Sequence, residues 1–409
     1  MRENTVKETV KKDFCINCGL CEFICPNNAI SLKFNKYLEK TPIINSKKCT
    51  NCSLCLNICP NSPQEMKTEA LACRDSLNEK IYGTNGDLYL AWNSNDEERS
   101  KSASGGAISK LAEYLLETKT IAGVIHVERI EAKRKEPHYR ACLSTSLEEL
   151  KRDERKNSAY QPIDFSEVLK SIDKNSTYLI TGTPCVIRGI NKLKEQGYKF
   201  ITSSLICSHN TNISLLDFIA DLLGIKNVPY FINTRNKDDL LNADLFNNHF
   251  YCKDKDLAKK PHFLTGWGKF WRNNYFAMNA CLYCSDFWGR EADISVKDAW
   301  GKWSKEDALG KSLVIIRDAK IKKLFFNCGL ETEILDKLFL ETHQQNVTTY
   351  KQQNAYSKNF KPFYYYRNIK NKHFKNVIIS KLSKVFYKTF GSKLTAKLMN
   401  IVEFILGAI

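Results

Sequence analysis

The chain has 409 residues, 43% of them hydrophobic and 26% charged, a composition typical of a globular protein of two or three domains. Its sequence contains no run of 18 apolar residues, which argues against a membrane-spanning helix, and its polar first residues lack the apolar core of a secretory signal. The net charge of +17 is concentrated at the C-terminal end, where residues 351–409 hold twelve Lys or Arg and a single acid. The remainder is only mildly basic, so nucleic-acid binding is not indicated.

Sixteen cysteines are many for this length, and half of them lie in two ligand-type clusters near the N-terminus. A secreted disulfide scaffold would be short and would begin with a signal. We therefore expect a reduced, cytoplasmic protein with metal sites.

Residues 1–70 contain two cysteine motifs with the same spacing, each followed by proline. They are Cys15, Cys18, Cys21 and Cys25 before Pro26, and Cys49, Cys52, Cys55 and Cys59 before Pro60. This is the spacing of bacterial two-cluster ferredoxins, in which the fourth cysteine of each motif binds the other cluster. We expect one [4Fe–4S] cluster on Cys15, Cys18, Cys21 and Cys59, and a second on Cys49, Cys52, Cys55 and Cys25. The alternative, a pair of zinc sites, fits poorly because zinc usually takes two well-separated Cys-x-x-Cys pairs.

The next predicted elements are a strand at residues 87–92, a Ser/Gly-rich loop at 102–106, a helix at 107–118 and an apolar strand at 122–127. A Ser/Gly turn at the start of a helix offers free N–H groups to an anion such as a flavin phosphate. The alternative is an ordinary capped helix after a flexible loop.

A strand–turn–helix–strand unit follows, with strands at 178–181 and 200–206 and a helix at 186–194. It predicts a parallel α/β arrangement, in which Cys185 and Cys207 follow the carboxyl ends of neighbouring strands. Cys281 and Cys284 later form a Cys-x-x-Cys pair. These four cysteines suffice for a third metal centre, either [4Fe–4S] or zinc.

Several of these motifs together resemble the beta subunits of coenzyme F420 hydrogenase/dehydrogenase, across roughly residues 85–320. The matching residues are the 102–106 loop, Ser158-Ala159-Tyr160-Gln161, Gly182-Thr183-Pro184-Cys185, Ile206-Cys207, Cys281-x-x-Cys284, Ala292-Asp293-Ile294-Ser295 with Asp298, and Gly310-Lys311-Ser312-Leu313-Val314. The resemblance implies an FAD beside a [4Fe–4S] cluster on Cys185, Cys207, Cys281 and Cys284. The implied flavin-binding residues are Ser102, Ser104, Gly105, Gly106, Ser158, Tyr160, Gln161 and Thr183.

The chain departs from the family pattern at three places. Val186 stands where Gln is common, Ser208-His209-Asn210 replaces His-Gly, and Lys297 replaces a Gly before Asp298. The cluster ligands match while the substrate-facing surroundings differ, so use of the deazaflavin itself stays open. His209 is a candidate acid/base group, the alternative being a hydrogen bond to cluster sulfur. The family also includes flavin reductases of other substrates, and many similar members accompany surface-glycan biosynthesis enzymes.

Residues 346–409 form a basic tail with an aromatic stretch at 360–366 and two helical patterns separated by Gly391. Apolar residues alternate with lysines at helical spacing, which suits a helix lying on an anionic membrane surface. The alternative is a helix pair docked on the body or on a partner, with a solvated lysine face.

The sequence thus predicts a mixed α+β and α/β protein of three parts: a two-cluster ferredoxin domain (1–70), an FAD and [4Fe–4S] domain (85–345) and a basic helical tail (346–409). We expect an iron–sulfur flavoprotein oxidoreductase that exchanges electrons with a redox partner or ferredoxin-type donor. The rival functions are an electron-transfer subunit of a partner enzyme, a coenzyme F420 oxidoreductase and a zinc-binding scaffold. Its expected location is the cytoplasm. If the tail lies on an anionic membrane surface, the protein is at the inner face of the membrane.

Overall fold

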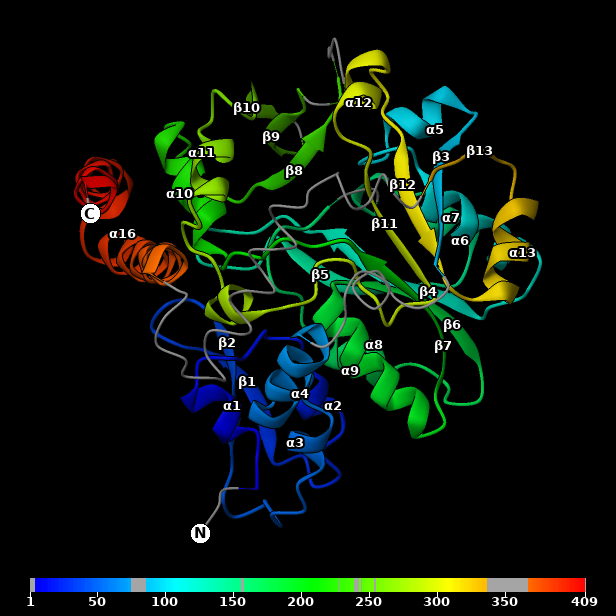
Figure 1. Ribbon diagram of the computed structural model, residues 1–409, viewed down its shortest axis with the longest axis horizontal. Coiled ribbons are helices and arrows are strands. Elements are labelled where there is room, and N and C mark those ends of the chain that lie inside the picture. The colour runs from blue at the N-terminus through cyan, green and yellow to red at the C-terminus, as the bar shows by residue number, and fades with distance from the viewer. Residues whose placement is uncertain are drawn as a thin grey trace.

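The computed structural model describes residues 4–74, 86–155, 158–226, 228–238, 243, 245–253, 255–336 and 367–408. Figure 1 shows a small N-terminal part below a larger body built around one sheet, with the C-terminal helices along one side. The body also carries a three-stranded sheet at the opposite end from the N-terminal part.

The N-terminal part consists of one hairpin and short helices. Its elements are α1 (Lys7–Lys11), α2 (Leu20–Phe23), β1 (Ile30–Phe34), β2 (Lys40–Ile44), α3 (Leu54–Asn57) and α4 (Pro63–Arg74). The cysteine motifs fold alike, since α2 and α3 both follow a residue with left-handed backbone, Gly19 at φ 79° and Ser53 at φ 65°. Ser53 therefore keeps the turn that glycine makes in the first motif, at a cost of about 1–2 kcal/mol for a side chain in this conformation.

The central sheet has eight strands in the order β13-β3-β12-β11-β7-β6-β4-β5. Their bounds are β3 (Asp87–Asn93), β4 (Gly123–Arg129), β5 (Tyr139–Ser144), β6 (Thr177–Gly182), β7 (Lys199–Leu205), β11 (Ile294–Asp298), β12 (Ser312–Ile316) and β13 (Leu330–Ile334). The inner pairs β4–β6, β6–β7 and β7–β11 are parallel, and the outer pairs are antiparallel. The predicted parallel unit is confirmed, because β6 and β7 pair directly and α9 (Pro184–Glu195) connects them.

Helices cover both faces of this sheet because its strands are apolar on both sides. On one face, α6 (Ala107–Glu117) and α13 (Ala319–Asn327) pack through Leu111 and Phe325. On the other, α8 (Ser166–Lys170) and α9 pack through Leu169 and Ile190. The predicted helix at 107–118 is confirmed as α6. The remaining short helices around the body are α5 (Asp96–Ser100), α7 (Leu147–Leu150), η1 (Asp153–Arg155), η2 (Asn279–Tyr283) and α12 (Lys302–Glu306).

A second apolar core lies under the small sheet. Strands β8 (Phe231–Asn236), β9 (Asn247–Cys252) and β10 (Lys255–Pro261) form an antiparallel sheet next to α10 (Ser214–Leu222) and α11 (Trp267–Arg272). Fully buried Phe218, Phe250 and Phe276 pack together in this core. The C-terminal helices complete it, with Ile379 and Met399 among the buried members.

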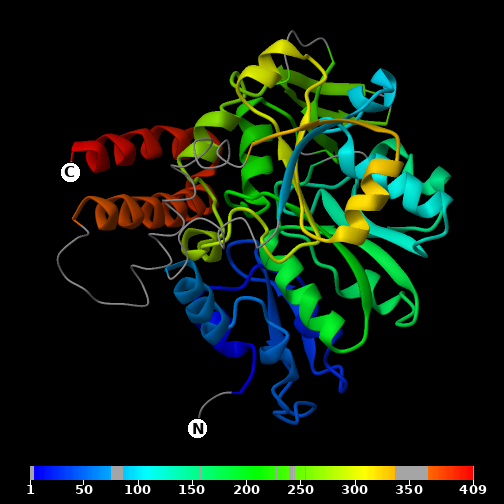
Figure 2. The same cartoon turned by 45° about the vertical axis from the view of Figure 1, so that its right-hand side comes forward.

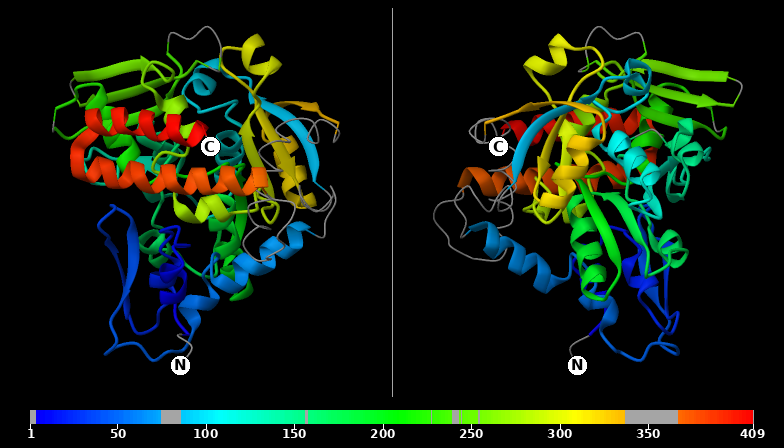
Figure 3. Two further views of the ribbon diagram at one scale, coloured as in Figure 1. Left: turned by 60° about the vertical axis from the view of Figure 1, so that its left-hand side comes forward. Right: turned by 90° about the vertical axis from the view of Figure 1, so that its right-hand side faces the viewer.

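The C-terminal element α16 (Arg367–Ala408) is two helices that meet at Gly391, whose backbone is non-helical. Figures 2 and 3 show the two helices side by side, and the first packs against α10. Ser383 Oγ accepts from Phe276 N at 2.9 Å, and buried Lys384 Nζ donates to Glu39 Oε1 at 2.7 Å. The docked alternative is therefore confirmed for the described part of the tail; the aromatic stretch 360–366 lies outside the described residues. No helix among those described is long and apolar enough to cross a membrane.

Candidate metal centres and the adjoining cavity

The structure brings together the cysteines expected for each N-terminal cluster. Burial first, and then its neighbour Cys59, raise the pKa of the Cys18 thiol well above its usual range, so the last cysteine of the second motif lies beside the first motif. Burial raises the pKa of the Cys55 thiol, to which nearby Cys49, Cys25 and Cys52 also contribute. The crossed arrangement of the two motifs is present in the fold.

The surroundings of these sulfurs suit thiolate ligands. Val6 N donates to Cys55 Sγ at 3.4 Å, and Ala29 N donates to Cys25 Sγ at 3.3 Å. Such N–H···S hydrogen bonds stabilise a cluster and tune its potential. Across the described residues, no three His, Cys, Asp or Glu side chains converge closely enough to hold a single metal ion.

Four further cysteines from distant parts of the chain meet at one end of the central sheet. Cys185 is in the first turn of α9, Cys207 follows β7, and Cys281 and Cys284 lie at η2. Burial, followed by Cys207, Cys185 and Cys284, raises the pKa of the Cys281 thiol, so the other three cysteines lie around Cys281. Asn210 N donates to Cys281 Sγ at 3.3 Å, the same kind of contact as in the N-terminal part.

The N-terminal part packs directly on the helix that carries Cys185. Leu20 and Ile58 share an apolar cluster with Ile190 of α9, and Phe165 N donates to Cys18 O at 3.0 Å. Gly189 makes the close approach possible, since an added Cβ would meet Leu20 Cδ1 at 2.2 Å. After burial and Cys59, Cys185 also raises the pKa of the Cys18 thiol. Cys18 of the first cysteine set therefore lies near Cys185 of the third.

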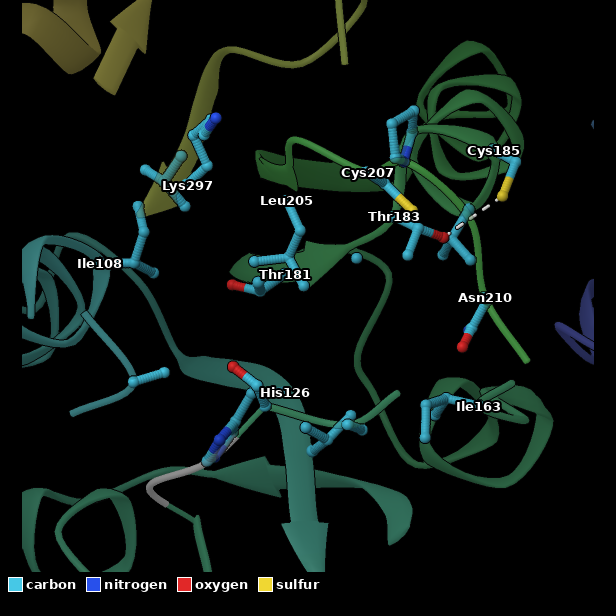
Figure 4. Close-up of a pocket in the computed structure, with 18 of the residues that line it drawn as sticks. Ile108, His126, Ile163, Thr181, Thr183, Cys185, Leu205, Cys207, Asn210 and Lys297 are labelled. Atoms are coloured by element: carbon cyan, nitrogen blue, oxygen red, sulfur yellow. Dashed lines mark hydrogen bonds between the residues drawn. The ribbon is translucent and has the colours of Figure 1, made fainter. Parts of the chain in front are cut away.

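A cavity of about 280 Å³ adjoins the third cysteine set. All four of its cysteines line the cavity, together with the start of α6, the end of β11 and the segment after Ser158. Figure 4 shows Cys185, Cys207 and Thr183 on one side of this space and Lys297 and Ile108 on the other. The residues that line it are both apolar and polar, as in cofactor sites.

Six of the eight residues expected to contact a flavin line this cavity: Ser102, Ser104, Gly106, Ser158, Gln161 and Thr183. Gly105 and Tyr160 are not among the lining residues, and both stay predictions. Gly105 is buried behind the loop, where an added Cβ would lie 2.6 Å from Ala91 O and 2.7 Å from Ser312 N. The Tyr160 ring instead packs edge-on against Trp267 and Trp271.

The serine hydroxyls of the loop are engaged by the protein itself. Ser102 donates to Glu98 O at 3.0 Å and Ser104 to Lys311 O at 2.8 Å. Gly106 begins α6 without a side-chain cap. The groups available to a ligand here are thus the N–H groups of the first turn of α6, and not the hydroxyls.

Two histidines line the cavity. His209 stacks on Trp271 with ring centroids 3.9 Å apart, and its Nδ1 lies 3.4 Å from Ser208 Oγ. His126 Nε2 is 2.7 Å from Ser144 Oγ, and burial, assisted by Arg155, lowers the pKa of His126 to about 4. His126 is neutral near pH 7, so it is a hydrogen-bonding group and not a cation. His126 was not predicted as a cavity residue, because a single histidine in a strand indicates no function.

Two cations, Arg235 at the end of β8 and Lys237 just after it, hold the loop, and neither was predicted from the sequence. Arg235 donates to Ala103 O at 3.0 Å and to Asp298 Oδ1 at 2.6 Å. Lys237 Nζ donates to Ser104 O at 2.7 Å, Leu309 O at 2.5 Å and Arg99 O at 3.2 Å. Because β8 is far from the loop in sequence, only the tertiary fold reveals the connection.

Models of known protein families match both the N-terminal part and the body of the chain. A model of the N-terminal domain of the coenzyme F420 hydrogenase/dehydrogenase beta subunit matches residues 88–170, and the model of the C-terminus of the same subunit matches residues 175–336. The chain belongs to this family. A 4Fe-4S dicluster domain matches residues 14–62, in front of the beta-subunit domains.

This member of the beta-subunit family is thus an iron–sulfur electron-transfer protein of an oxidoreductase class. One solved structure similar to it is the xenon-derivatised F420-reducing [NiFe] hydrogenase complex from Methanosarcina barkeri. The match has 18% sequence identity and a TM-score of 0.49, and covers 69% of this chain and 93% of that chain. No curated protein matches this chain significantly.

Proposed function

We propose that this beta-subunit homologue is an iron–sulfur flavoprotein oxidoreductase. It passes electrons between its ferredoxin-type [4Fe–4S] clusters and FAD, and from there to or from a hydride-accepting substrate. The observation that carries this proposal is that Cys185, Cys207, Cys281 and Cys284 line the same cavity as the uncapped start of α6. The candidate cluster ligands and the candidate anion site therefore line one cavity.

The three cysteine sets follow one another in space. The set with Cys49, Cys52 and Cys55 is outermost, with Cys52 exposed; the set with Cys18 is buried against α9, and the set with Cys185 follows. Peptide N–H groups donate to sulfur in the outermost and the innermost set. The protein's part in electron transfer is to fix these distances and to set potentials through burial and hydrogen bonding.

The flavin would be held by the first turn of α6, by Thr183 and by the segment from Ser158 to Gln161. FAD, when bound, supplies hydride chemistry to a substrate. Lys237 and Arg235 keep the loop in place, and the side-chain amide of Gln161 fixes its segment by donating to Tyr139 O at 3.3 Å. His209 remains a prediction as the acid/base group, since it lines the cavity beside Cys207.

Coenzyme F420 is one candidate acceptor, because it is named in the family to which the chain belongs. An acceptor in surface-glycan biosynthesis is another. The second candidate function is an electron-transfer subunit that serves a partner enzyme, which the exposed position of Cys52 favours. We place the protein in the cytoplasm, with the tail as a candidate contact to the inner face of the membrane.

Cys284→Ala tests the proposal. The variant should keep FAD and the two N-terminal clusters, which should still be reduced by dithionite or ferredoxin. Reduction of the flavin, followed by stopped-flow absorbance under anaerobic conditions, should slow at least about a hundredfold because one ligand of the connecting cluster is missing. Cys142→Ala is the control, since Cys142 is a cysteine of β5 that does not line the cavity. Unchanged flavin reduction in Cys284→Ala would refute the proposed route.

A further inference from the structure

Lys384 of the tail and Glu39 of the N-terminal part form a buried ion pair that the proposed function has not yet used. Lys384 Nζ lies 2.7 Å from Glu39 Oε1, and each side chain is only 8% exposed. Asn35 Nδ2 donates to the other carboxylate oxygen, Glu39 Oε2, at 3.3 Å. Removing two charges from water is costly, and a buried ion pair contributes little net stability. Attachment of the tail alone therefore does not account for this pair.

Glu39 lies close to the first cysteine set. Its neighbours Leu38 and Lys40 line one groove together with Asn17. Asn17 Nδ2 in turn donates to Cys15 Sγ at 3.6 Å. Burial raises the pKa of the Cys15 thiol to about 12, and the negative charge of Glu39 adds to this effect. The carboxylate of Glu39 therefore acts on the place where the first cluster is expected.

The same tail helix also holds the segment that leads to the third cysteine set. Ser380 Oγ donates to Ala277 O at 2.8 Å, and Ser383 Oγ accepts from Phe276 N at 2.9 Å. Both serines are buried. Phe276 and Ala277 come just before η2, which carries Cys281. One short stretch of the tail thus contacts the surroundings of two cysteine sets.

A further hydrogen-bonded residue joins these surroundings to each other. Asn212 N donates to Phe276 O at 2.9 Å, and Asn212 Nδ2 donates to Tyr37 O in the hairpin at 3.0 Å. Figure 3 shows the first tail helix passing over the end of this hairpin, where Lys384 meets Glu39. The hairpin, the segment before η2 and the tail therefore hold Glu39 in one fixed position.

We propose that Lys384 sets the reduction potential of the first cluster, by neutralising Glu39 and fixing its carboxylate beside that cluster. This inference rests on the proposed function, because it requires a cluster on the first cysteine set. Lys384 is a positioning residue, since it acts through Glu39. A negative charge near a cluster opposes the addition of an electron, so an unpaired Glu39 lowers the potential. The potential of the first cluster then depends on whether the tail is docked.

The experiment measures the midpoint potentials of the N-terminal clusters in full-length protein purified without oxygen, by redox titration followed by EPR. Lys384→Met should shift one N-terminal cluster to a more negative potential, because Glu39 loses its counter-charge. Glu39→Gln should shift the same cluster to a more positive potential, because Lys384 then acts alone. The double variant should lie between the two single variants. Lys384→Arg keeps the charge and should stay close to the unaltered protein.

Lys381→Met is the matched control, because Lys381 is an exposed lysine on the same helix. It should leave both potentials unchanged. Glu39→Gln keeps the size of the side chain, so it decides the question even if Lys384→Met fails to fold.

Unchanged potentials in the Lys384 and Glu39 variants, or shifts in the same direction, would reduce the pair to a structural role and overturn the inference. The proposed function would then still stand if the unaltered protein reduces its flavin. Absence of any reducible N-terminal cluster in the unaltered protein would overturn both.

Discussion

Single buried residues shape the cavity, and Lys237 is the clearest case. Its side chain is 8% exposed, and burial followed by the nearby charge of Arg235 lowers its pKa to about 7. Its three carbonyl partners nevertheless require all three N–H groups of the ammonium form. Lys237 thus holds the backbone of the 102–106 loop through its hydrogen bond to Ser104 O.

Lys237→Met should therefore act through the loop. Three carbonyl groups lose a charged donor, which should lower the free energy of unfolding by about 2–4 kcal/mol. FAD and riboflavin affinity should fall together, because the whole loop is displaced. Thermal unfolding and flavin titration check this, with exposed Lys260→Met as control. Unaltered stability and unaltered flavin affinity would contradict the positioning role.

Functional residues could be predicted from the sequence where their spacing alone indicates what they bind. The eight N-terminal cysteines are of this kind, since the 2-2-3 spacing before proline determines which thiols can meet. Gly105 and Tyr160 stay predictions, because a motif does not say which of its members face the ligand. Nothing in the local sequence indicated Arg235 and Lys237, since the partners that hold them lie more than 60 residues away.

At the scale of elements, the apolar patterns predicted the strands and helices of the parallel region, β4, α6, β6, α9 and β7. The antiparallel strands β12 and β13 were not predicted, although β13 is an edge strand of the sheet and β12 lies against Gly105 of the loop. The sheet β8–β10 was also missed, because its strands mix polar and apolar residues without a regular alternation. Periodicity identifies an amphipathic strand more readily than an irregular one.

The tail shows a different limit of sequence reasoning. A helix with lysines on one face and apolar residues on the other suits a membrane surface and a protein surface equally. The decisive contact, Lys384 with Glu39, joins residues 345 positions apart. Docking also leaves an outer face that is both basic and apolar: Lys388, Lys393 and Lys397, with Phe390, Leu394, Ile401, Phe404 and Ile405.

We predict that this outer face binds anionic vesicles. Changing Lys388, Lys393 and Lys397 together to Gln should weaken binding at least about tenfold, since each lysine near an anionic surface contributes about 1 kcal/mol. Vesicle flotation at low and high salt measures this, and neutral vesicles and a triple variant at Lys199, Lys320 and Lys323 are the controls. Equal flotation of the tail variant and the unaltered protein would restrict the tail to its docked, structural role.

At the scale of the whole molecule, the cysteine sets follow one another from the exposed tip of the N-terminal part to the cavity in the body. The tip carries Cys52, exposed Leu54, and the exposed pair Lys47 and Lys48. The one acid between residues 24 and 58 is Glu39, which is buried and paired with Lys384. This surface favours a negatively charged electron carrier.

Reversing the charge of the tip should therefore slow electron entry. Lys47→Glu with Lys48→Glu should lower the second-order rate constant for reduction by an acidic ferredoxin at least about tenfold at low salt, and less at high salt. Reduction by dithionite should not change. The pair Lys320→Glu and Lys323→Glu on α13 is the matched control. The same rate in the tip variant and the control would place the entry point elsewhere.

The cofactor content of the intact chain tests the central claim most directly. We predict that protein purified without oxygen holds about twelve irons and about twelve acid-labile sulfides, as three [4Fe–4S] clusters require. It should also release about one FAD on denaturation, because the anion site and the third cysteine set share one cavity. Zinc in place of iron and sulfide, or iron without any flavin, would contradict the account.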